Sequence, residues 1–375
     1  MKPDLDRPAV VLAATAVGTA GIVVFAVLPV LVGLISDRFG LSDAQAGNTA
    51  SAYFLVYALI ALSAPLWIRR ANWRILAAAG CLTMIAGLCW LSAASGFQAV
   101  ISAMLLTGAG ASVLLPISLT LVADMVHVDR AYGITVSAEQ LIPALLIFAL
   151  SAGLFGGYDL QNALWACIVL TIICIMASYA LPSRGRPRQE AQRDQPKRYL
   201  AYLSLVALGI SFAGFASLWA FAERLAVNGG LAQAFSARWI AVGLVMTAVG
   251  PLVAAVVETR FGRVLPIALG TVLCVASLVG LTGTTTEAGY ATVLVLFPLS
   301  YYFVLSYVLS IIADADRGGS ASSLMSFALA CGALAGPSIF GVLKGNAALI
   351  SVSVLVTAGA ALAGYVQTRI APQAS

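Results

Sequence analysis

Residues 10–35 read VVLAATAVGTAGIVVFAVLPVLVGLI and contain no charged side chain. A run of about 20 apolar residues is long enough to cross the hydrocarbon core of a bilayer as one α-helix. This run is too long for the apolar core of a signal peptide, and no small-residue cleavage site stands out near it. We therefore predict that these residues form the first membrane-spanning helix.

Eleven further apolar runs follow the first, each bounded by charged or turn-forming residues. Hydrophobic residues make up 61% of the 375 residues and charged residues 9%, with a mean hydropathy of +0.99. A soluble domain has roughly a quarter charged residues, and the strands of a membrane β-barrel span only about ten residues. We predict an all-α integral membrane protein with twelve transmembrane helices. The further spans are expected at residues 44–67, 75–95, 98–122, 132–155, 161–182, 199–222, 235–257, 264–283, 289–312, 320–342 and 347–367.

The positions of Lys and Arg residues indicate how the predicted helices are oriented, because cytoplasmic loops carry an excess of both. If the N-terminus lies inside, 16 of the 20 Lys and Arg residues fall in inside segments, and only Arg38, Arg224, Arg238 and Lys344 fall outside. If one span had been missed or wrongly added, every later loop would be assigned to the opposite side of the membrane. The excess of Lys and Arg in the inside segments would then disappear. We predict that both termini are cytoplasmic and that the protein is a multi-pass protein of a bacterial inner membrane.

A polar segment separates two similar halves of the chain. Residues 183–198 are rich in Arg and Pro and poor in apolar residues, which predicts a flexible cytoplasmic linker. We expect six-helix bundles at residues 1–182 and 199–375. Short matches recur about 190 residues apart, and because each half has an even number of helices, the halves form parallel repeats. The matching segments are 40–44 with 230–234, 74–76 with 263–265, and 122–124 with 312–314.

Residues typical of metal sites, nucleotide binding and hydrolysis are scarce. The six Cys residues lie inside apolar runs without the spacing of metal ligands, and His127 is the single His. We therefore expect no metal site, no cofactor and no enzymatic activity. The net charge of +5 follows the loop pattern described above and does not predict nucleic-acid binding. The expected partners are the lipid bilayer, a small-molecule substrate and, as a candidate, the proton; a monomer is expected.

Several segments resemble signatures of the major facilitator superfamily. Residues 39–47, FGLSDAQAG, resemble the entry into its second helix. The family loop after that helix reads roughly G-x-L-x-D-R-x-G-R-R; residues 64–74 keep two of its Arg residues but have Ile68 in place of the Asp. Residues 258–263, ETRFGR, form a second copy, in which Glu258 is expected to supply the carboxylate. The resemblance implies twelve helices in the family fold, with a cytoplasmic gate formed by Arg69, Arg74, Glu258, Arg260 and Arg263.

Two other signatures of the superfamily are absent. Many of its proton-coupled antiporters carry an Arg in helix 4, four residues before a Gly; here Met104 precedes Gly108 at that spacing. The glycine-rich motif of its drug antiporters is missing from residues 139–143, EQLIP. These departures count against a multidrug/proton efflux antiporter, which is kept as the alternative function.

Glu139 is the strongest candidate for ion coupling. It lies about two turns inside the predicted span 132–155, where an ionised carboxylate is destabilised by several kcal/mol unless it is paired, hydrated or protonated. We interpret Glu139 as a proton carrier, and a structural hydrogen bond is the alternative. Glu223, at the end of the seventh span, is the second candidate for proton coupling, with a role in an outer gate as its alternative.

Polar and aromatic residues recur four apart on several predicted helices, which places them on one face. In the superfamily, helices 1, 4, 7 and 10 line the central cavity, and the resemblance implies that these faces do so here. Packing between helices is the alternative. Arg238 is expected to bind an anionic group or to extend to the membrane surface. The substrate-binding candidates are Thr19, Gln45, Tyr53, Tyr57, Trp219, Arg238, Tyr302, Ser306 and Tyr307.

These observations predict a secondary active transporter that moves a small organic or amphiphilic solute across the membrane by alternating access. An organic anion is one option for the substrate, and proton uptake by Glu139 is the leading mechanism. Exchange without proton coupling and facilitated diffusion are alternatives. A membrane-embedded receptor or enzyme is the alternative of another class. A receptor usually adds a soluble domain and an enzyme needs clustered catalytic groups, and the sequence shows neither.

Overall fold

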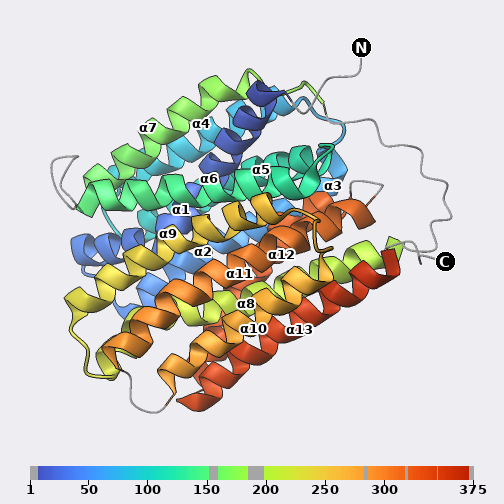
Figure 1. Cartoon of the computed structure of the whole chain (residues 1–375). Coiled ribbons are helices and arrows are strands. Elements are labelled where there is room, and N and C mark those ends of the chain that lie inside the picture. Colours follow the sequence, from blue (N-terminus) through green and yellow to red (C-terminus); the bar gives the residue numbers. More distant parts are fainter. Residues whose placement is uncertain are drawn as a thin grey trace, which may run out of the picture. The chain divides into compact units, whose positions relative to one another are not determined.

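The computed structural model describes residues 7–151, 159–184, 198–282, 286–316, 320–343 and 345–370. Helices make up almost all of these ranges and coincide with the predicted spans (Figure 1). Ten of the described helices are long and apolar enough to cross a membrane, and Gly47–Leu62 and Ser322–Pro337 are shorter apolar helices. The prediction of an all-α chain with twelve apolar helical segments is confirmed. The elements are α1 (Pro8–Phe39), α2 (Asp43–Leu62), α3 (Ala64–Trp67), α4 (Trp73–Ser92), α5 (Phe97–Ala123), α6 (Val128–Ser151), α7 (Leu160–Ser178), α8 (Arg198–Asn228), α9 (Gln233–Val257), α10 (Val264–Ser277), η1 (Leu278–Leu281), α11 (Glu287–Ala315), η2 (Ser322–Leu324), α12 (Met325–Val342) and α13 (Asn346–Ile370).

The chain divides into two compact units. The first unit comprises Met1–Val126 and Ala138–Pro187, and the second comprises His127–Ser137 and Arg188–Ser375. The division cuts α6, whose first turns belong to the second unit and whose remainder belongs to the first. The sequence prediction had assigned this whole helix to the first half. Most of the predicted linker 183–198 lies outside the described residues.

The beginning of α6 is fixed in the second unit by several side chains. The Ser137 hydroxyl donates a hydrogen bond to the Ala248 carbonyl of α9, with a distance of 2.6 Å. The Tyr132 side chain is fully buried, and its hydroxyl lies 3.4 Å from the sulfur of Met325 at the start of α12. Residues 127–137 are therefore packed against helices that lie more than 100 positions later in the chain.

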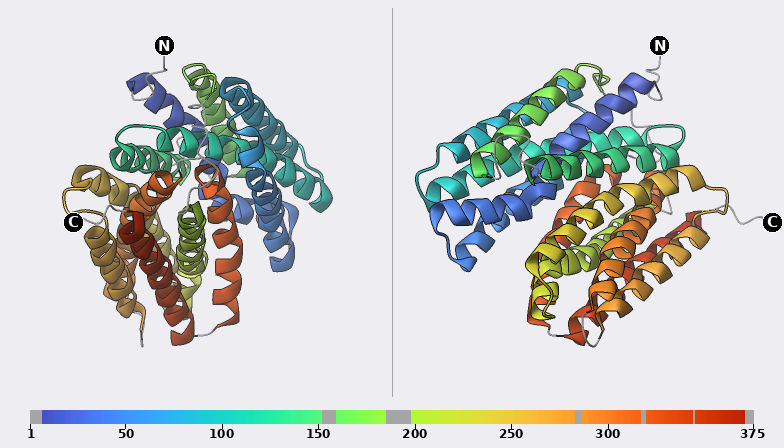
Figure 2. Two further views of the ribbon diagram at one scale, coloured as in Figure 1. Left: turned by 90° about the vertical axis from the view of Figure 1, so that its right-hand side faces the viewer. Right: turned by 60° about the vertical axis from the view of Figure 1, so that its left-hand side comes forward.

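The same helix pairing recurs in the two units (Figures 1 and 2). In the first unit, α5 packs against α1, α2 and α4, and α7 packs against α1 and α4. In the second unit, α11 packs against α8, α9 and α10, and α13 packs against α8 and α10. Helices that follow the same order along the chain thus occupy the same place in each unit, as a parallel repeat requires.

A glycine with a left-handed backbone ends the first helix of each unit. Gly40 follows α1 with φ +59°, and Gly230 follows α8 with φ +82°. The next amide donates back into the helix in both cases, from Leu41 to the Ser36 carbonyl at 3.1 Å and from Leu231 to the Ala226 carbonyl at 3.0 Å. This bond pattern caps a helix and favours Gly, because a Cβ is strained in this conformation. The repeated Gly-Leu pair in the sequence therefore reflects a repeated helix end.

Replacing either capping glycine with Ala will destabilise the protein. We expect Gly40→Ala and Gly230→Ala each to lower the free energy of unfolding by about 1–2 kcal/mol, because each places a Cβ on a left-handed backbone. Thermal unfolding in a non-ionic detergent measures the effect. Gly47→Ala is the matched control: it lies inside α2, and nothing is within 4 Å of the added Cβ. Equal midpoints for Gly40→Ala and Gly47→Ala would contradict the proposed role of the cap.

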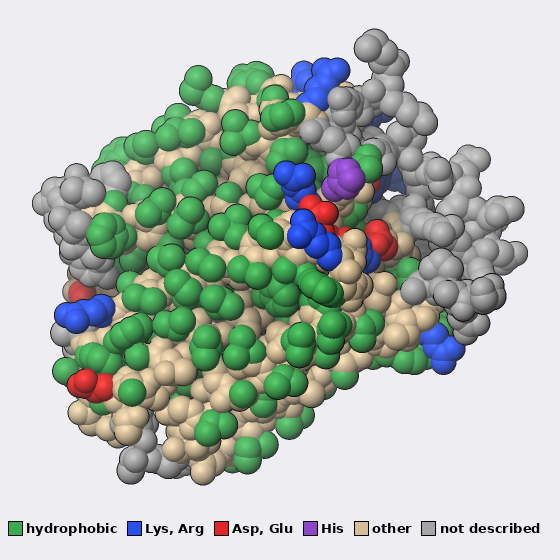
Figure 3. Space-filling model, viewed as in Figure 1, with side chains coloured by type: hydrophobic (Ala, Val, Ile, Leu, Met, Phe, Trp, Pro, Cys, Tyr) green, Lys and Arg blue, Asp and Glu red, His purple; other side chains and the backbone are tan. Residues whose placement is uncertain are grey.

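Large hydrophobic side chains cover the outer faces of the helices. In Figure 3 hydrophobic side chains cover the middle of the visible helices, and charged side chains gather near helix ends. A hydrocarbon solvent accepts such faces, whereas water does not. The exposed large side chains of α7 are Trp165, Val169, Ile172, Ile173 and Met176.

Candidate functional site

Glu139 lies at the centre of a buried polar cluster in the first unit. It projects from the part of α6 that belongs to this unit, and only 2% of its surface is exposed. The Ser118 hydroxyl of α5 donates a hydrogen bond to its Oε1 atom at 3.0 Å. A neutral donor orients a carboxylate but does not cancel its charge. Glu139 is therefore held in place and remains free to bind a proton or another cation.

Gly18 of α1 provides the space that the Glu139 carboxylate fills. A Cβ at this position would lie 1.7 Å from Glu139 Oε1 and 2.6 Å from Ser118 Oγ. Three helices thus meet at the carboxylate, with Gly18 from α1, Ser118 from α5 and Glu139 from α6. The sequence analysis identified Glu139 but missed the other two residues. Neither has a local signal, because each acquires its role only through packing between helices.

Substituting Gly18 with Ala will disturb the carboxylate more than the fold. The added methyl group displaces the mobile end of Glu139 from Ser118, and we expect the proton binding predicted for Glu139 to weaken about tenfold, the equivalent of one lost hydrogen bond. Gly21→Ala is the control on the same helix, since its Cβ would lie 2.7 Å from the rigid Leu115 backbone nitrogen. That variant should lower the thermal midpoint and leave the coupling of the folded protein unchanged. Identical effects of the two variants on stability and coupling would contradict this assignment.

Two of the predicted substrate residues pack against each other in the first unit. Tyr53 and Tyr57 of α2 are both buried, and their ring centroids are 5.9 Å apart. Tyr57 is close enough to Glu139 for an electrostatic interaction. Within the described residues, the Tyr53 hydroxyl has no hydrogen-bond partner. The structure therefore places the two aromatic rings beside each other, with Tyr57 within electrostatic range of the carboxylate.

Two other candidates of the first unit are engaged by the backbone. The Thr19 hydroxyl donates to the Thr15 carbonyl one turn earlier in α1, at 2.8 Å. The Gln45 side chain accepts a hydrogen bond from the Ser42 amide at 3.0 Å and completes a capping box at the start of α2. Both side chains thus have structural roles here, which the sequence analysis did not anticipate for Gln45.

The second unit contains a stack of aromatic rings between α8 and α11. Phe215 stacks on Trp219 with a centroid distance of 5.6 Å and on Tyr301 with a distance of 4.7 Å. Tyr302 meets the edge of Phe215 at 5.2 Å, and the Ser306 hydroxyl donates to the Tyr302 carbonyl at 3.1 Å. Trp219 is half-buried at one end of the stack. The predicted residues Trp219 and Tyr302 therefore belong to one aromatic wall.

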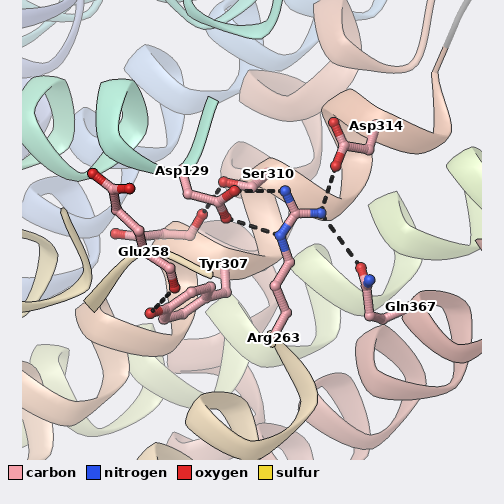
Figure 4. A network of polar contacts seen from close by, with 8 residues as sticks. Asp129, Glu258, Arg263, Tyr307, Ser310, Asp314 and Gln367 are labelled. Atoms are coloured by element: carbon pink, nitrogen blue, oxygen red, sulfur yellow. Dashed lines mark hydrogen bonds and ion pairs between the residues drawn. The ribbon is translucent and has the colours of Figure 1, made fainter. Parts of the chain in front are cut away.

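The hydroxyl of Tyr307 contacts the backbone at the end of α9. Its hydroxyl donates a hydrogen bond to the Glu258 carbonyl at 2.9 Å (Figure 4). Glu258 ends α9 with φ +48° and ψ −134°, a backbone conformation that side chains other than Gly rarely adopt. In this structure the polar atom of Tyr307 therefore contacts the loop after α9, and its assignment as a substrate residue stays a prediction.

Arg263 joins several helices of the second unit at the same end (Figure 4). Its guanidinium donates to Asp129 of α6 at 2.9 and 2.6 Å, to Asp314 of α11 at 2.5 Å and to Gln367 of α13 at 3.4 Å. Burial lowers the pKa of Arg263, but the two carboxylates outweigh burial, and the pKa is raised overall. Asp129 and Asp314 thus fill the carboxylate role that the sequence analysis had given to Glu258.

The corresponding loop of the first unit uses a different arginine. Arg69 forms a bidentate ion pair with Asp124 at the end of α5, with 2.9 Å between Nη2 and Oδ1. Arg74 donates to the Leu181 carbonyl at 2.5 Å. Arg260, in the second unit, is exposed. Of the five predicted gate residues, Arg69 and Arg263 pair with carboxylates.

Arg238 lies apart from both clusters. Arg238 lies in the second turn of α9 and is exposed, which favours the alternative of an interfacial Arg. The side chain of Glu223 lies outside the described part of the structure. Within the described ranges, no group of three His, Cys, Asp or Glu side chains converges in a way that could hold a metal ion.

Comparisons with known proteins agree on one family. The model of the Major Facilitator Superfamily matches residues 13–337. The solved Fucose:proton symporter FucP of E. coli is 12% identical, with a TM-score of 0.74, and the match covers 99% of this chain and 100% of FucP. The proton:xylose symporter XylE is 11% identical, with a TM-score of 0.74 and coverage of 97% and 94%. The human organic anion transporter MFSD10 is 15% identical, with a TM-score of 0.71 and coverage of 96% and 100%. No curated protein sequence matches.

Proposed function

Because the chain belongs to the Major Facilitator Superfamily, we propose that it moves a small organic or amphiphilic solute by alternating access, driven by a proton that binds Glu139. As a member of this family it is a multi-pass membrane transporter and not an enzyme. The twelve apolar helices in two parallel repeats are the family fold. The solute, the coupling ion and the cellular membrane are parts of the proposal.

The buried carboxylate of Glu139 is the observation that carries proton coupling. A carboxylate inside a membrane protein is stabilised by a counter-charge, by water or by a proton. Its described partner is the neutral hydroxyl of Ser118, so a proton is the smallest group that can neutralise it. Two of the structural neighbours are named as proton symporters, which is consistent with proton coupling on this fold.

The ion pairs at helix ends support an assignment of the inner gate. We propose that the end of each unit with Arg69 or Arg263 faces the cytoplasm, as the distribution of Lys and Arg predicts. Guanidinium–carboxylate pairs such as Arg69–Asp124 are strong and directional and can lock helix ends. A monomer in the bacterial inner membrane is the expected state.

The two aromatic clusters support an organic solute. The first unit contributes Tyr53 and Tyr57, and the second contributes Phe215, Trp219 and Tyr302. Aromatic side chains bind apolar or amphiphilic molecules over large areas. The structure weakens the option of an organic anion, because Arg238 is exposed near a helix end and joins neither cluster.

Alternating access can be tested without knowing the solute. Spin labels at Arg70→Cys in the first unit and Phe261→Cys in the second, both exposed positions, report the distance between the units. The six native Cys residues are replaced first. We expect two populations of distances whose ratio changes between pH 5 and pH 8. A single distance that pH leaves unchanged would overturn the proposal.

A further inference from the structure

We infer that a groove on the outer surface of the first unit binds one acyl chain of a phospholipid, whose phosphate group contacts Arg38. The groove lies between α6 and α7 and has a volume of about 300 Å³. The inference depends on the membrane location of the chain. It does not depend on the transported solute or on the coupling ion, so it stands or falls separately from the proposed function.

The groove is formed by a ridge of large side chains beside a small one. Trp165, Val169 and Ile173 lie four residues apart on α7 and are each half-exposed. Ala166, in the neighbouring row of the same helix, is buried and has no atom beyond its Cβ. Leu146 of α6 completes the lining from the other helix. The hollow therefore follows from one Ala in a row where a longer side chain would fill the space.

The length of the groove matches the hydrocarbon depth of one leaflet. The exposed Asp159 caps α7 and accepts a hydrogen bond from the Asn162 amide at 2.9 Å. A carboxylate is stable at the aqueous boundary and not in hydrocarbon, so α7 begins at the membrane surface. The lining runs from Asn162 to Ile173, a rise of about 16 Å at about 1.5 Å per residue. One leaflet contributes about 15 Å of hydrocarbon.

The polarity of the lining changes with depth as that of a phospholipid does. At the shallow end, the Asn162 side chain donates a hydrogen bond to Asp159 at 2.7 Å. Trp165 follows one turn deeper, and Trp is enriched at the boundary between headgroups and hydrocarbon. Aliphatic side chains line the rest of the groove. A flexible acyl chain gains dispersion contacts along such a surface, whereas a polar solute would find no hydrogen-bond partner there.

Arg38 supplies a positive charge at the shallow end of the groove. Its guanidinium donates to Gln161 Oε1 at 3.5 Å and to the Ser92 carbonyl at 3.4 Å. Gln161 directly precedes Asn162 in α7 and lies one turn before Trp165. The guanidinium is thus held at the same end of α7 where the groove begins.

The charge of Arg38 is not neutralised by the protein. Both of its acceptors are neutral, and both bonds are long. Within the described ranges Arg38 forms no ion pair, whereas Arg69 and Arg263 do. Arg38 is also one of the four basic residues outside the predicted inside segments, so the bias of Lys and Arg toward the cytoplasm does not explain it. A lipid phosphate beside it would form charge-assisted hydrogen bonds.

Quenching of Trp165 by brominated lipids tests the inference. The full-length protein in a non-ionic detergent is titrated with phosphatidylglycerol brominated in its acyl chains. The matched probe is diacylglycerol with the same brominated chains and no phosphate. The contribution of Trp165 is the fluorescence that a Trp165→Phe variant lacks. We expect phosphatidylglycerol to quench this contribution at a mole fraction about fivefold lower than diacylglycerol does.

Trp90 of α4 is the control for lipids that merely surround the protein. Its exposed fraction of 48% is close to the 50% of Trp165, but it does not line the groove. Its contribution is isolated in the same way with Trp90→Phe. We expect the two lipids to quench Trp90 equally.

Variants separate the headgroup contact from the acyl-chain contact. Arg38→Gln should raise the mole fraction of phosphatidylglycerol needed to that of diacylglycerol and leave diacylglycerol unaffected. Ala166→Leu fills the floor of the groove and should weaken quenching by both lipids. Ala177→Leu makes the same change on the same helix outside the lining and should behave as wild type. Thermal midpoints show which variants are folded, and Arg38→Gln decides the test if Ala166→Leu does not fold.

Three results would each overturn the inference: equal quenching of Trp165 by the two lipids, a preference for phosphatidylglycerol that survives Arg38→Gln, or the same response of Trp165 and Trp90. None of them bears on alternating access, which the spin labels measure. A single spin-label distance at all pH values would in turn leave the lipid site standing.

Discussion

Replacing Glu139 with Gln will abolish proton-driven transport and leave the fold intact. The amide has nearly the same shape as the protonated carboxyl group, and it can still accept the hydrogen bond from Ser118. It cannot take up or release a proton, so the site becomes permanently neutral. We expect the spin-label distances of Glu139→Gln to become independent of pH, and solute movement driven by a pH gradient in proteoliposomes to fall to the level of protein-free vesicles.

Two variants serve as controls for this result. Glu139→Asp keeps the titrating group on a shorter side chain and should retain partial coupling. Ser118→Ala removes the hydrogen-bond donor and should shift the pH dependence without abolishing it. If Glu139→Gln kept full transport under a pH gradient, proton binding at this residue would be excluded. Equal loss in all three variants would instead indicate a structural role for the whole cluster.

Replacing Arg263 with Met will destabilise the second unit. The guanidinium is buried, with 9% exposure, and its partner Asp129 has 13% exposure. Removing one member of a buried ion pair leaves an uncompensated charge and lowers the free energy of unfolding by about 3–5 kcal/mol. The loss includes the link from α6 to α11 and α13, because Arg263 also contacts Asp314 and Gln367 (Figure 4). Thermal unfolding in a non-ionic detergent measures it.

A double-mutant cycle separates the charge from the packing. Adding Asp129→Asn to Arg263→Met removes the stranded carboxylate and should recover part of the lost stability. Arg260→Met is the matched control, since Arg260 lies three residues earlier in the same loop and is exposed. It should change the unfolding free energy by less than about 0.5 kcal/mol. If Arg263→Met unfolded at the same temperature as Arg260→Met, the buried network would have no stabilising role.

The fold was predictable because the thickness of a bilayer sets the length of each apolar run. The observed ends of some helices differ from the predicted ends of the spans because of individual Gly and Pro residues. The first helix continues past Ile35 to Phe39, since only Gly40 has the backbone freedom to end it. The predicted span 44–67 is broken after Leu62, and Pro65 lies in the first turn of the short helix that follows. Proline has no amide hydrogen, so it fits the start of a helix better than its interior.

Residues of the site were predictable only where a charged side chain lies within an apolar stretch of sequence. Glu139 stands out because a carboxylate inside an apolar run needs a physical reason. Gly18 and Ser118 do not stand out, because glycine and serine are common in membrane helices and only tertiary packing aligns them with Glu139. Asp129 was missed for the opposite reason: it follows a polar loop and looked solvated, yet it binds Arg263. The hydrogen bond of Tyr307 was not predictable because a helix face does not reveal which backbone atom a hydroxyl reaches.

The first turns of α6 belong to the second unit and the rest of this helix to the first, which has a consequence for biosynthesis. A ribosome completes residues 127–137 long before α9 and α12, which supply Ala248 and Met325 as their packing partners. The side chain of Tyr132 therefore lacks this packing partner until more than 100 further residues have been synthesised. The later part of the chain therefore completes the packing of the first turns of α6, which belong to the same compact unit.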